Sequence, residues 1–459
     1  MRAPAARRGF AAIALVAALL GLVGLVAPAT ATPARPEGKA SAVDHRPATP
    51  LHHLVVMMQS GHSFDNYLGR RSGDDGIPRG VCVPVHGGTS RPCLRPHPIN
   101  GSPHANLASA AASEATAVDG GRMDGFVRAQ AGSARGGAAL GYYPPRSVPV
   151  LTSLANHGEV FDHWFAAVPG DTIANRLFAV TGAVPAGDPA EVPASGWSGA
   201  TIFDRLQAAD VAWRIYVEDY RPGLTLGSAT LAERRTGQLA LVPLLASSGF
   251  RRDPALSGHV VGLGRYYADL AHNRLPAVSF VVSTTHTERP PHNPAVDQEL
   301  VRSVANALLA SSAWSSSAFL LTYDTSGGWY DHVPPTRIDG ARTGLRVPTI
   351  LVSPYVKPDT VDHTTYDSAS VLGLIEHNWR LPSLTGRDRT AASLLPVFSF
   401  RTPPGRPALI DARSSRPPLH QPRSLVLYGG YLLALAAGLG CVGWVLWREH
   451  PWRAAASRP

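Results

Sequence analysis

The chain has 459 residues, of which 44% are hydrophobic and 16% are charged, with 44 glycines and 41 prolines. This length and composition exclude a small disulfide-stapled scaffold and a wholly disordered chain, and they allow one large α/β domain or two to three smaller domains. The formal net charge of +9 falls to +4 on residues 32–423 once the two ends, residues 1–31 and 424–459, are set aside. The charge therefore gives no basis for a nucleic-acid-binding protein.

The first 31 residues have the pattern of an export signal. An apolar run over residues 10–27 follows several arginines, and Ala29-Thr30-Ala31 has the small-x-small form that a signal peptidase cuts. Arg7-Arg8-Gly9-Phe10 also fits a twin-arginine signal. An uncleaved N-terminal anchor is the alternative, because the apolar run approaches the length of a membrane span. We expect a signal peptide over 1–31 and a Pro/Ala-rich linker over 32–50.

Residues 51–401 carry an alternation of strand and helix patterns. The expected strands are His53–Met58, Ala277–Val282, Ala318–Thr322 and Val347–Val352, and the expected helices include Ile202–Ala209, Gln298–Ser311 and Ser368–Trp379. Such alternation predicts an α/β fold with a mainly parallel central sheet and helices on both faces. Residues 132–141 and 183–200 are expected to form surface loops.

Three cysteines bear on the compartment of the protein. Cys82 and Cys93 lie eleven positions apart in the body that we expect to be exported. An oxidising compartment favours a disulfide between them, and two unpaired thiols are the alternative. Cys441 lies in the apolar segment near the C-terminus.

The C-terminal region has the pattern of a single membrane span. Residues 424–447 form a 24-residue run without a charge, which at 1.5 Å per residue reaches about 36 Å and exceeds the ~30 Å hydrocarbon core. Arg448, Arg453 and Arg458 follow it, so the positive-inside rule puts a short tail, residues 448–459, in the cytoplasm and the body outside. A Pro-rich stalk over 402–423 precedes the span. A buried core helix is the alternative for 424–447.

Polar segments directly follow the expected strands, where parallel-sheet proteins place their reactive groups. They are residues 59–65 (QSGHSFD), 169–176 (PGDTIANR), 323–332 (YDTSGGWYDH) and 353–355 (SPY). These segments, together with GGRMDGFV (120–127), GYYPP (141–145), TIFDRL (201–206) and the stretch 346–384, resemble a bacterial phosphoesterase family that contains exported phospholipases C and acid phosphatases. That family is a branch of the alkaline-phosphatase-like superfamily. The resemblance covers roughly residues 51–395 and implies an alkaline-phosphatase-like fold.

The resemblance implies a hydroxyl nucleophile beside a metal that activates it. The family places this nucleophile in Pro-Gly-Pro-Ser/Thr, which falls on Thr172 here. Substrate binding is assigned to Asn175, Arg176 and His104, and an arginine can hold a phosphate by two charge-assisted hydrogen bonds. Without the resemblance, Thr172 would be interpreted as a turn residue that caps the following helix.

The metal ligands of the family are not carried over in the same way. The family motif Met-Gln-Glu-Asn-Arg-Ser-Phe-Asp has Ser60-Gly61 in place of its Glu-Asn pair, and Tyr-Asp-Glu-His-Gly-Gly has Thr325-Ser326 in place of its Glu-His pair. Asp324 is the remaining carboxylate, and a Glu-His-Pro-Pro segment is altered to residues 288–291 (ERPP). One carboxylate is a poor ligand set for a hard divalent cation. The divalent metal expected for the family is therefore doubtful here.

Substitute ligands are an open alternative. His62, Asp171, His286 and His292 lie in or near the same segments. Asp171 replaces a proline of the family motif, and its charge repels phosphate unless a cation lies there. We expect Asp65 and Asp331-His332, which lie in retained segments, to support the loops by hydrogen bonds.

These observations predict a membrane-anchored extracytoplasmic protein with a phosphoesterase domain over 51–401, and they predict impaired metal binding. A pseudoenzyme is the alternative: it would bind a phosphorylated lipid, an envelope polymer or a protein partner at the same cleft. A phosphoester substrate or a phosphorylated envelope ligand is the expected partner, together with the membrane through residues 424–447.

Overall fold

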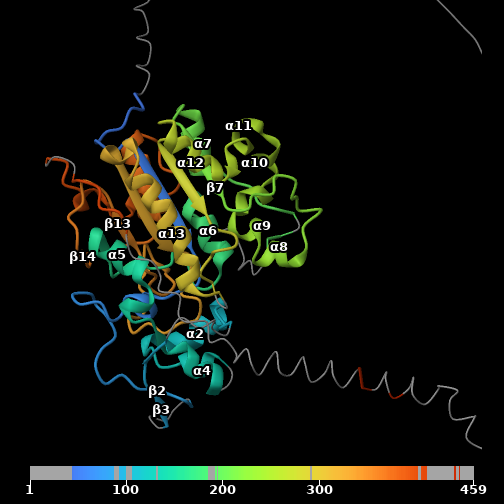
Figure 1. Ribbon diagram of the computed structural model, residues 1–459, viewed down its shortest axis with the longest axis vertical. Helices are drawn as coiled ribbons and strands as arrows, with labels where there is room; N and C mark the ends of the chain where they lie inside the picture. Colours follow the sequence, from blue (N-terminus) through green and yellow to red (C-terminus); the bar gives the residue numbers. More distant parts are fainter. Residues whose placement is uncertain are drawn as a thin grey trace, which may run out of the picture. The chain divides into compact units, whose positions relative to one another are not determined.

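A sheet of eight strands organises the computed structural model of the protein (Figure 1). The order across the sheet is β14 (Thr360–Asp362), β6 (Glu159–Phe161), β13 (Ile350–Val352), β10 (Ser317–Tyr323), β1 (His53–Gln59), β9 (Val278–Val282), β7 (Trp213–Val217) and β8 (Val260–Gly262). All neighbouring pairs are parallel except those that β13 makes, because β13 runs antiparallel to both β10 and β6. The α/β fold with a mostly parallel central sheet is thus confirmed.

The structure describes residues 44–86, 92–99, 106–130, 133–183, 192–193, 195–289, 292–401, 405–410, 439–440 and 444. The predicted signal peptide, most of the linker and stalk, nearly all of the segment 424–447 and His104 lie outside these residues. Within the part of the chain that is described, no helix is long and apolar enough to cross a membrane.

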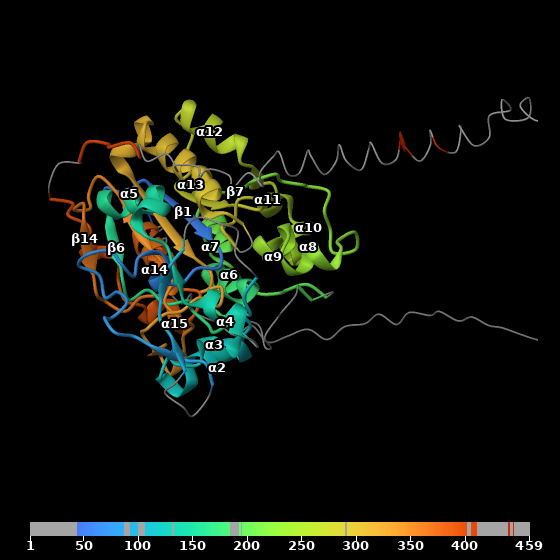
Figure 2. The same cartoon turned by 60° about the horizontal axis from the view of Figure 1, so that its bottom comes forward.

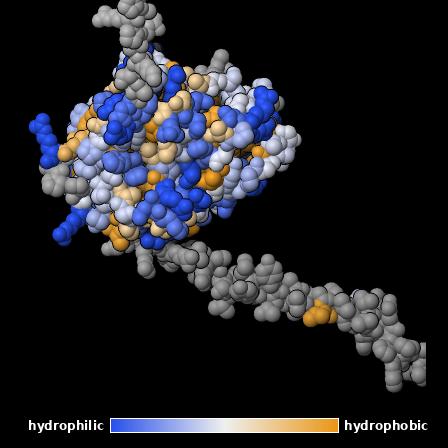
Figure 3. Space-filling view, turned by 90° about the horizontal axis from the view of Figure 1, so that it is seen from above, coloured by the Kyte–Doolittle hydropathy of each residue, from blue (hydrophilic) through white to orange (hydrophobic). Residues whose placement is uncertain are grey.

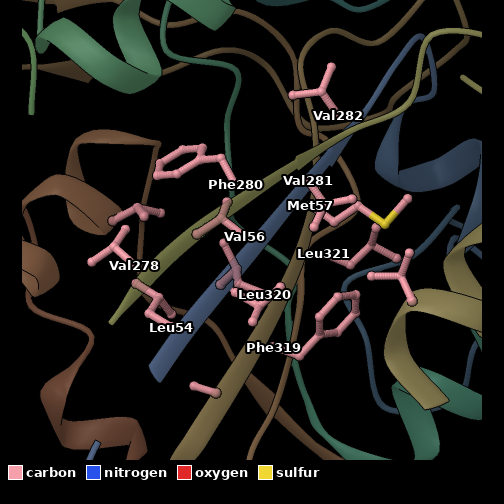
Figure 4. Packing of buried hydrophobic residues seen from close by; sticks show 14 of the residues in the cluster. Leu54, Val56, Met57, Val278, Phe280, Val281, Val282, Phe319, Leu320 and Leu321 are labelled. Atoms are coloured by element: carbon pink, nitrogen blue, oxygen red, sulfur yellow. The ribbon is translucent and has the colours of Figure 1, made fainter. Parts of the chain in front are cut away.

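The centre of the sheet is apolar on both faces. Val55 of β1 pairs with Phe319 of β10, and Val56 pairs with Phe280 of β9. Figure 4 shows the side chains of these three strands packed together, and all of those labelled are buried. A parallel strand covered on both faces needs apolar residues at successive positions, which explains why HLVVMM shows no alternation.

Helices cover the sheet. One set comprises α5 (Pro149–His157), α12 (Gly264–Ala271) and α13 (Pro294–Leu309), in which α13 contacts the other two; a second comprises α6 (Thr172–Thr181), α7 (Ile202–Ala208), α9 (Gln238–Leu241), α14 (Ala369–Trp379) and α15 (Gly386–Thr390). Figure 1 shows α13 across one face of the sheet, and Figure 2 shows α14 beside α15. Shorter helices are α1 (Phe64–Tyr67), α2 (Ala111–Val118), α3 (Phe126–Ala129), α4 (Ser133–Ala139), α8 (Leu231–Arg235), α10 (Ser248–Arg252) and α11 (Pro254–Ser257).

A smaller layer lies beside the main sheet and carries a disulfide. It has its own apolar cluster, and its short strands are β2 (Val83–Pro84), β3 (Cys93–Leu94), β4 (His97–Pro98) and β5 (Gly141–Tyr142). A further two-stranded ribbon elsewhere comprises β11 (Arg337–Ile338) and β12 (Ala341–Arg342). Cys82 and Cys93 are joined in the structure, with their Cα atoms 5.4 Å apart.

One predicted loop is a helix. The sequence predicts a surface loop over residues 132–141, but residues 133–139 form α4, although glycine pairs disfavour helices. A Cβ atom at Gly136 would lie 2.6 Å from Cγ1 of Val127 in α3. The glycine therefore allows close packing of α4 on α3, and this tertiary contact outweighs the low helix propensity.

The face of the molecule drawn in Figure 3 is largely hydrophilic, and its apolar side chains form small separate patches. The extensive apolar surface of the strands is thus enclosed within the fold on this side. Such small patches are ordinary on a protein surface.

Candidate active site and its charged neighbours

The ends of β1 and β10 bring the first two site residues together. Gln59 and Tyr323 are paired in register at the ends of these parallel strands, so the next residues, Ser60 and Asp324, are neighbours. The Ser60 hydroxyl donates a hydrogen bond to Oδ2 of Asp324 at 2.6 Å. Both side chains are buried.

Thr172 enters the same site from α6. It is the first residue of that helix, and Asp171 is the N-cap, whose Oδ1 accepts from the backbone N–H of Ile173 at 3.0 Å. The capping role that the sequence alone would give to Thr172 therefore belongs to Asp171. The Thr172 hydroxyl donates instead to Oδ1 of Asp324 at 3.4 Å. The predicted nucleophile position thus faces the remaining carboxylate.

Asn175 holds the loop that leads into α6. Its Nδ2 donates to the carbonyl of Val168 at 3.0 Å, and its Oδ1 accepts from the Val168 N–H at 3.1 Å. In this structure the Asn175 amide shapes the turn around Thr172. Its predicted contact with substrate stays a prediction.

Arg176 fills the space beside Asp324. Its Nε donates to Oδ2 of Asp324 at 2.8 Å, and its Nη2 donates to Ser60 Oγ at 3.1 Å. The same guanidinium also donates to the carbonyls of Met58 at 2.9 Å and Leu241 at 3.2 Å. Only 3% of the Arg176 side chain is exposed. A positive group thus neutralises the Asp324 carboxylate.

These residues do not fit a divalent metal. Around Asp324 the donors are the hydroxyls of Ser60, Thr172 and Thr325, the last at 3.2 Å from Oδ1. One carboxylate with neutral hydroxyls is a weak set for a hard cation, and the Arg176 guanidinium already supplies the positive charge.

The proposed substitute ligands are not brought together around Asp324. His62 is fully buried between Asn66 and Glu288, as described below. His286 lies 2.5 Å from Glu218 through Nδ1, and His292 lies 3.3 Å from Asp297. Burial works against a charge on His286, but the Glu218 carboxylate prevails and raises the pKa of the ring.

A second charged cluster, formed by Asp65, Asp331 and His332, brings together side chains that could bind one ion. Among the described residues, Asp65, Asp331 and His332 are the group whose possible ligand atoms lie within 4.8 Å of one another. The Arg346 guanidinium lies between them, with Nε 2.9 Å from Asp331 and Nη2 3.1 Å from Asp65. Arg346 is completely buried. The acceptor oxygens are therefore already paired with a cation.

Burial and the neighbouring charges together set the pKa values of Asp331 and His332 in this second cluster. Burial, together with the nearby Asp65 charge, raises the pKa of Asp331 to about 6 despite the opposing Arg346 charge. Burial lowers the pKa of His332, but the hydrogen bond to Asp65 at 2.8 Å outweighs it, so the net direction is upward. These are the hydrogen bonds between retained segments that the sequence predicted.

Three buried polar residues near these sites were given no role of their own from the sequence, although one of them, Glu288, begins the altered segment 288–291. Arg346 precedes β13, and in an arginine-rich chain it carries no local signal. Glu114 of α2 accepts from the Gly170 N–H at 3.2 Å, next to the Thr172 loop, and burial raises its pKa to about 7. Glu288 is fully buried, and burial raises its pKa to about 7 as well.

In a comparison of the sequence with models of protein families, the model described as the phosphoesterase family matches residues 51–382. The chain belongs to the phosphoesterase family. The matched region holds β1, α6, β10 and all of the site residues around Asp324.

Several proteins named phospholipase C are similar to the chain over much of its length. Non-specific phospholipase C6 of Arabidopsis thaliana is 28% identical over 450 residues, which cover 86% of this chain and 82% of that protein. Phospholipase C A of Mycobacterium tuberculosis is 26% identical over an alignment that covers 82% of this chain and 80% of that protein. Non-specific phospholipase C1 of Arabidopsis thaliana is 30% identical over 62% of this chain and 56% of its own length.

Solved structures share less with the chain. A protein of the alkaline phosphatase superfamily from Vibrio parahaemolyticus aligns over 72% of this chain and 68% of its own, with 13% identity and a TM-score of 0.35. At that score the likeness carries no further argument. The phosphoesterase assignment rests on the family match and the phospholipase C relatives.

Proposed function

We propose that this protein acts on phosphoester compounds at the outer face of a cell membrane, as an exported phosphoesterase with an impaired hold on divalent metal. One arrangement carries the proposal: Oδ1 of Asp324 faces the Thr172 hydroxyl at 3.4 Å, while Oδ2 pairs with Arg176 at 2.8 Å. The hydroxyl at the proposed nucleophile position lies beside one carboxylate oxygen, and a guanidinium pairs with the other.

The relatives give the substrate class of the proposal. They are named phospholipases C, so a phospholipid phosphodiester is the first substrate to test and a phosphomonoester the second. The predicted span, residues 424–447, would keep the body near such a lipid, with the tail 448–459 in the cytoplasm.

Membrane placement has its own test. Protease added outside intact cells should release a soluble fragment of about the size of residues 32–423. Accessibility of the C-terminal tail from outside would contradict the proposed orientation.

A second candidate is a non-catalytic protein that binds a phosphorylated lipid, an envelope polymer or a protein partner at this site. The observation in its favour is that Ser60 and Thr325 stand where the family motif has glutamates, so the carboxylate count at Asp324 is low. A divalent cation gains little Coulomb energy from one carboxylate that a guanidinium already neutralises.

The two candidates are separated by metal content and turnover of the purified protein. Elemental analysis is paired with hydrolysis of a phosphodiester and a phosphomonoester, with and without added divalent metal. Thr172→Ala should abolish specific turnover if the hydroxyl is the nucleophile, typically by orders of magnitude. Thr181→Ala is the matched control, because Thr181 ends the same helix and its hydroxyl donates to the Leu177 carbonyl at 2.8 Å.

Each outcome selects one reading. Slow turnover without bound metal that depends on Thr172 supports the impaired enzyme. Binding of phosphoester without turnover, unchanged in Thr172→Ala, supports the non-catalytic protein. One tightly bound metal per chain with fast turnover would contradict the impaired metal site.

A further inference from the structure

His62 is completely buried, and both of its ring nitrogens face oxygen atoms. Nδ1 lies 2.6 Å from Oδ1 of Asn66, and Nε2 lies 2.8 Å from the backbone carbonyl of Glu288. The orientation of the Asn66 amide is set by its own Nδ2, which donates to the Gly141 carbonyl at 2.7 Å. Both oxygens that face the ring are therefore acceptors.

A neutral imidazole has one N–H and satisfies only one of these contacts. At the other contact, an unprotonated ring nitrogen would face an acceptor oxygen less than 3 Å away, with no hydrogen between them. Turning the ring over would place carbon atoms against both oxygens and lose both hydrogen bonds. We infer that His62 is a buried imidazolium that acts as a positioning residue and ties the loop carrying Ser60 to the loop carrying Glu288.

The aromatic surroundings of His62 suit a positive ring. The Tyr67 ring is stacked on it, with centroids 4.0 Å apart and an interplanar angle of 15°. The Trp329 ring is nearly parallel at 5.9 Å and 12°. The faces of such rings carry negative potential and attract a cation, most strongly when water is excluded. The two flanking rings thus offset part of the cost of burying the charge.

A carboxyl group near the His62 ring supplies the opposite charge. Glu288 Oε2 accepts from Tyr67 Oη at 2.7 Å, and Oε1 accepts from Tyr323 Oη at 2.9 Å. The side-chain amides of Gln59 and Gln298 each donate to this carboxyl at 3.2 Å. Burial raises the pKa of Glu288 to about 7, and the donors around the carboxyl oppose that rise, so the ionised form is favoured at pH 7.5. The same residue therefore offers its carbonyl to the imidazolium and its carboxylate to the surrounding donors.

Three further titratable groups that face His62 stay neutral. They are Tyr67 of α1, Tyr143 after β5 and Tyr323 of β10, whose rings lie 4.0, 6.2 and 6.1 Å from it. Burial, and then the Glu288 charge, raise the pKa of all three phenols well above the usual value. Glu288 is the charged group in this set.

The position of Ser60 depends on this link. The Ser60 N–H donates to the Thr287 carbonyl at 3.1 Å, and two residues later His62 donates to the adjacent Glu288 carbonyl. The two bonds fix residues 60–62 against residues 287–288 and present the Ser60 hydroxyl to Asp324. Loss of the ring proton would leave one acceptor without its donor and loosen this attachment. The family motif quoted above has arginine at the position of His62, which is a permanent cation.

The test reads the protonation state directly. The full chain is labelled with ¹⁵N-histidine, and NMR spectra are recorded at pH 7.5 for the unaltered protein and for His62→Arg, whose missing signals assign His62. We expect both His62 nitrogens to be protonated. A His62 ring with one protonated nitrogen at pH 7.5 would overturn the inference.

Two variants check the positioning role. His62→Gln keeps a side chain of similar reach with no charge, and we expect its unfolding equilibrium constant to rise by roughly 10- to 100-fold, because a buried acceptor loses its donor. His62→Arg should recover at least half of that loss on a logarithmic scale. Equal losses in both variants would contradict a role for the charge. If His62→Gln does not fold, the NMR measurement on the unaltered protein still decides. Neither readout uses hydrolysis, so the outcome is independent of the proposed function.

Discussion

Two buried arginines, Arg176 and Arg346, each lie against carboxylates, but they meet different amounts of negative charge. Arg176 pairs with one carboxylate, Asp324. Arg346 pairs with Asp331 and Asp65 and lies 3.8 Å from a third carboxylate, that of Asp75; it also donates to the carbonyls of residues 75 and 162 at 2.9 and 2.8 Å. The first site is close to neutral and the second is rich in acid.

The difference shows what each arginine does. At Asp324 the guanidinium balances the one carboxylate that the family motif retains, so a divalent cation gains little there. In the second cluster the guanidinium, which precedes β13, holds together acids from two segments, one after β1 and one after β10. Removing the arginine should therefore matter more for folding in the second cluster, and changing the acids should matter more for metal binding in the first.

The largest expected effect is on stability. Arg346→Met leaves Asp65 and Asp331 buried without a guanidinium, and we expect a loss of about 3–5 kcal/mol in the free energy of unfolding. Arg176→Met is the matched comparison and should lose less, because Asp324 is one carboxylate and keeps the Ser60 hydrogen bond. Urea unfolding measures both. A larger loss in Arg176→Met would reverse the comparison.

The next effect is a pH dependence of the free energy of unfolding, which arises in the second charged cluster. The folded-state pKa of Asp331 is raised to about 6, so its stabilisation is complete below the unfolded pKa of about 4 and is lost as the pH rises through about 6. Relative to Asp331→Asn, the unaltered protein should therefore lose about 2 kcal/mol of unfolding free energy between pH 4.5 and pH 7. Denaturant titrations at the two pH values measure it, and a difference that does not change with pH would refute the assignment.

Metal affinity should change when the site around Asp324 and Arg176 is altered. Restoring the family ligands by Ser60→Glu, Gly61→Asn, Thr325→Glu and Ser326→His should raise affinity for Mn²⁺ at least tenfold, about 1.4 kcal/mol, in calorimetric titrations. Gly61 has φ of +77°, a conformation that asparagine tolerates better than most residues. The same set without Gly61→Asn controls for strain there. Asp331→Asn alone should leave affinity unchanged, and a gain from it would place the metal in the second cluster.

The smallest effect on stability is expected at the partly exposed edge of the second charged cluster. His163 Nε2 lies 3.1 Å from Asp75, and 30% of the His163 side chain is exposed. Water screens such a pair, so His163→Gln should change the free energy of unfolding by less than about 1 kcal/mol. A loss in urea unfolding as large as that of Arg346→Met would mean that the exposed His163–Asp75 pair contributes as much stability as the buried arginine.

The long strands and the family motifs could be predicted from sequence. β1, β9 and β10 match the expected apolar runs within one or two residues, while β13 is confined to Ile350–Val352. The strands β6, β8 and β14 have three residues each, too short for a pattern, and they exist because neighbouring strands supply their partners. Helix α4 escaped prediction for the same reason, since its packing on α3 is a tertiary property.

The sequence by itself determined the α/β class, the segments that form the site and the loss of the family's metal-ligand types, because apolar runs and motif letters are local. Only the tertiary structure decided that Arg176 neutralises Asp324, 148 positions away, and that Arg346 lies between Asp65 and Asp331. The physical reason is that the charge balance of a buried site depends on which distant side chains share one volume from which water is excluded. A linear pattern names the charges, and the packing of the sheet and helices decides which of them meet.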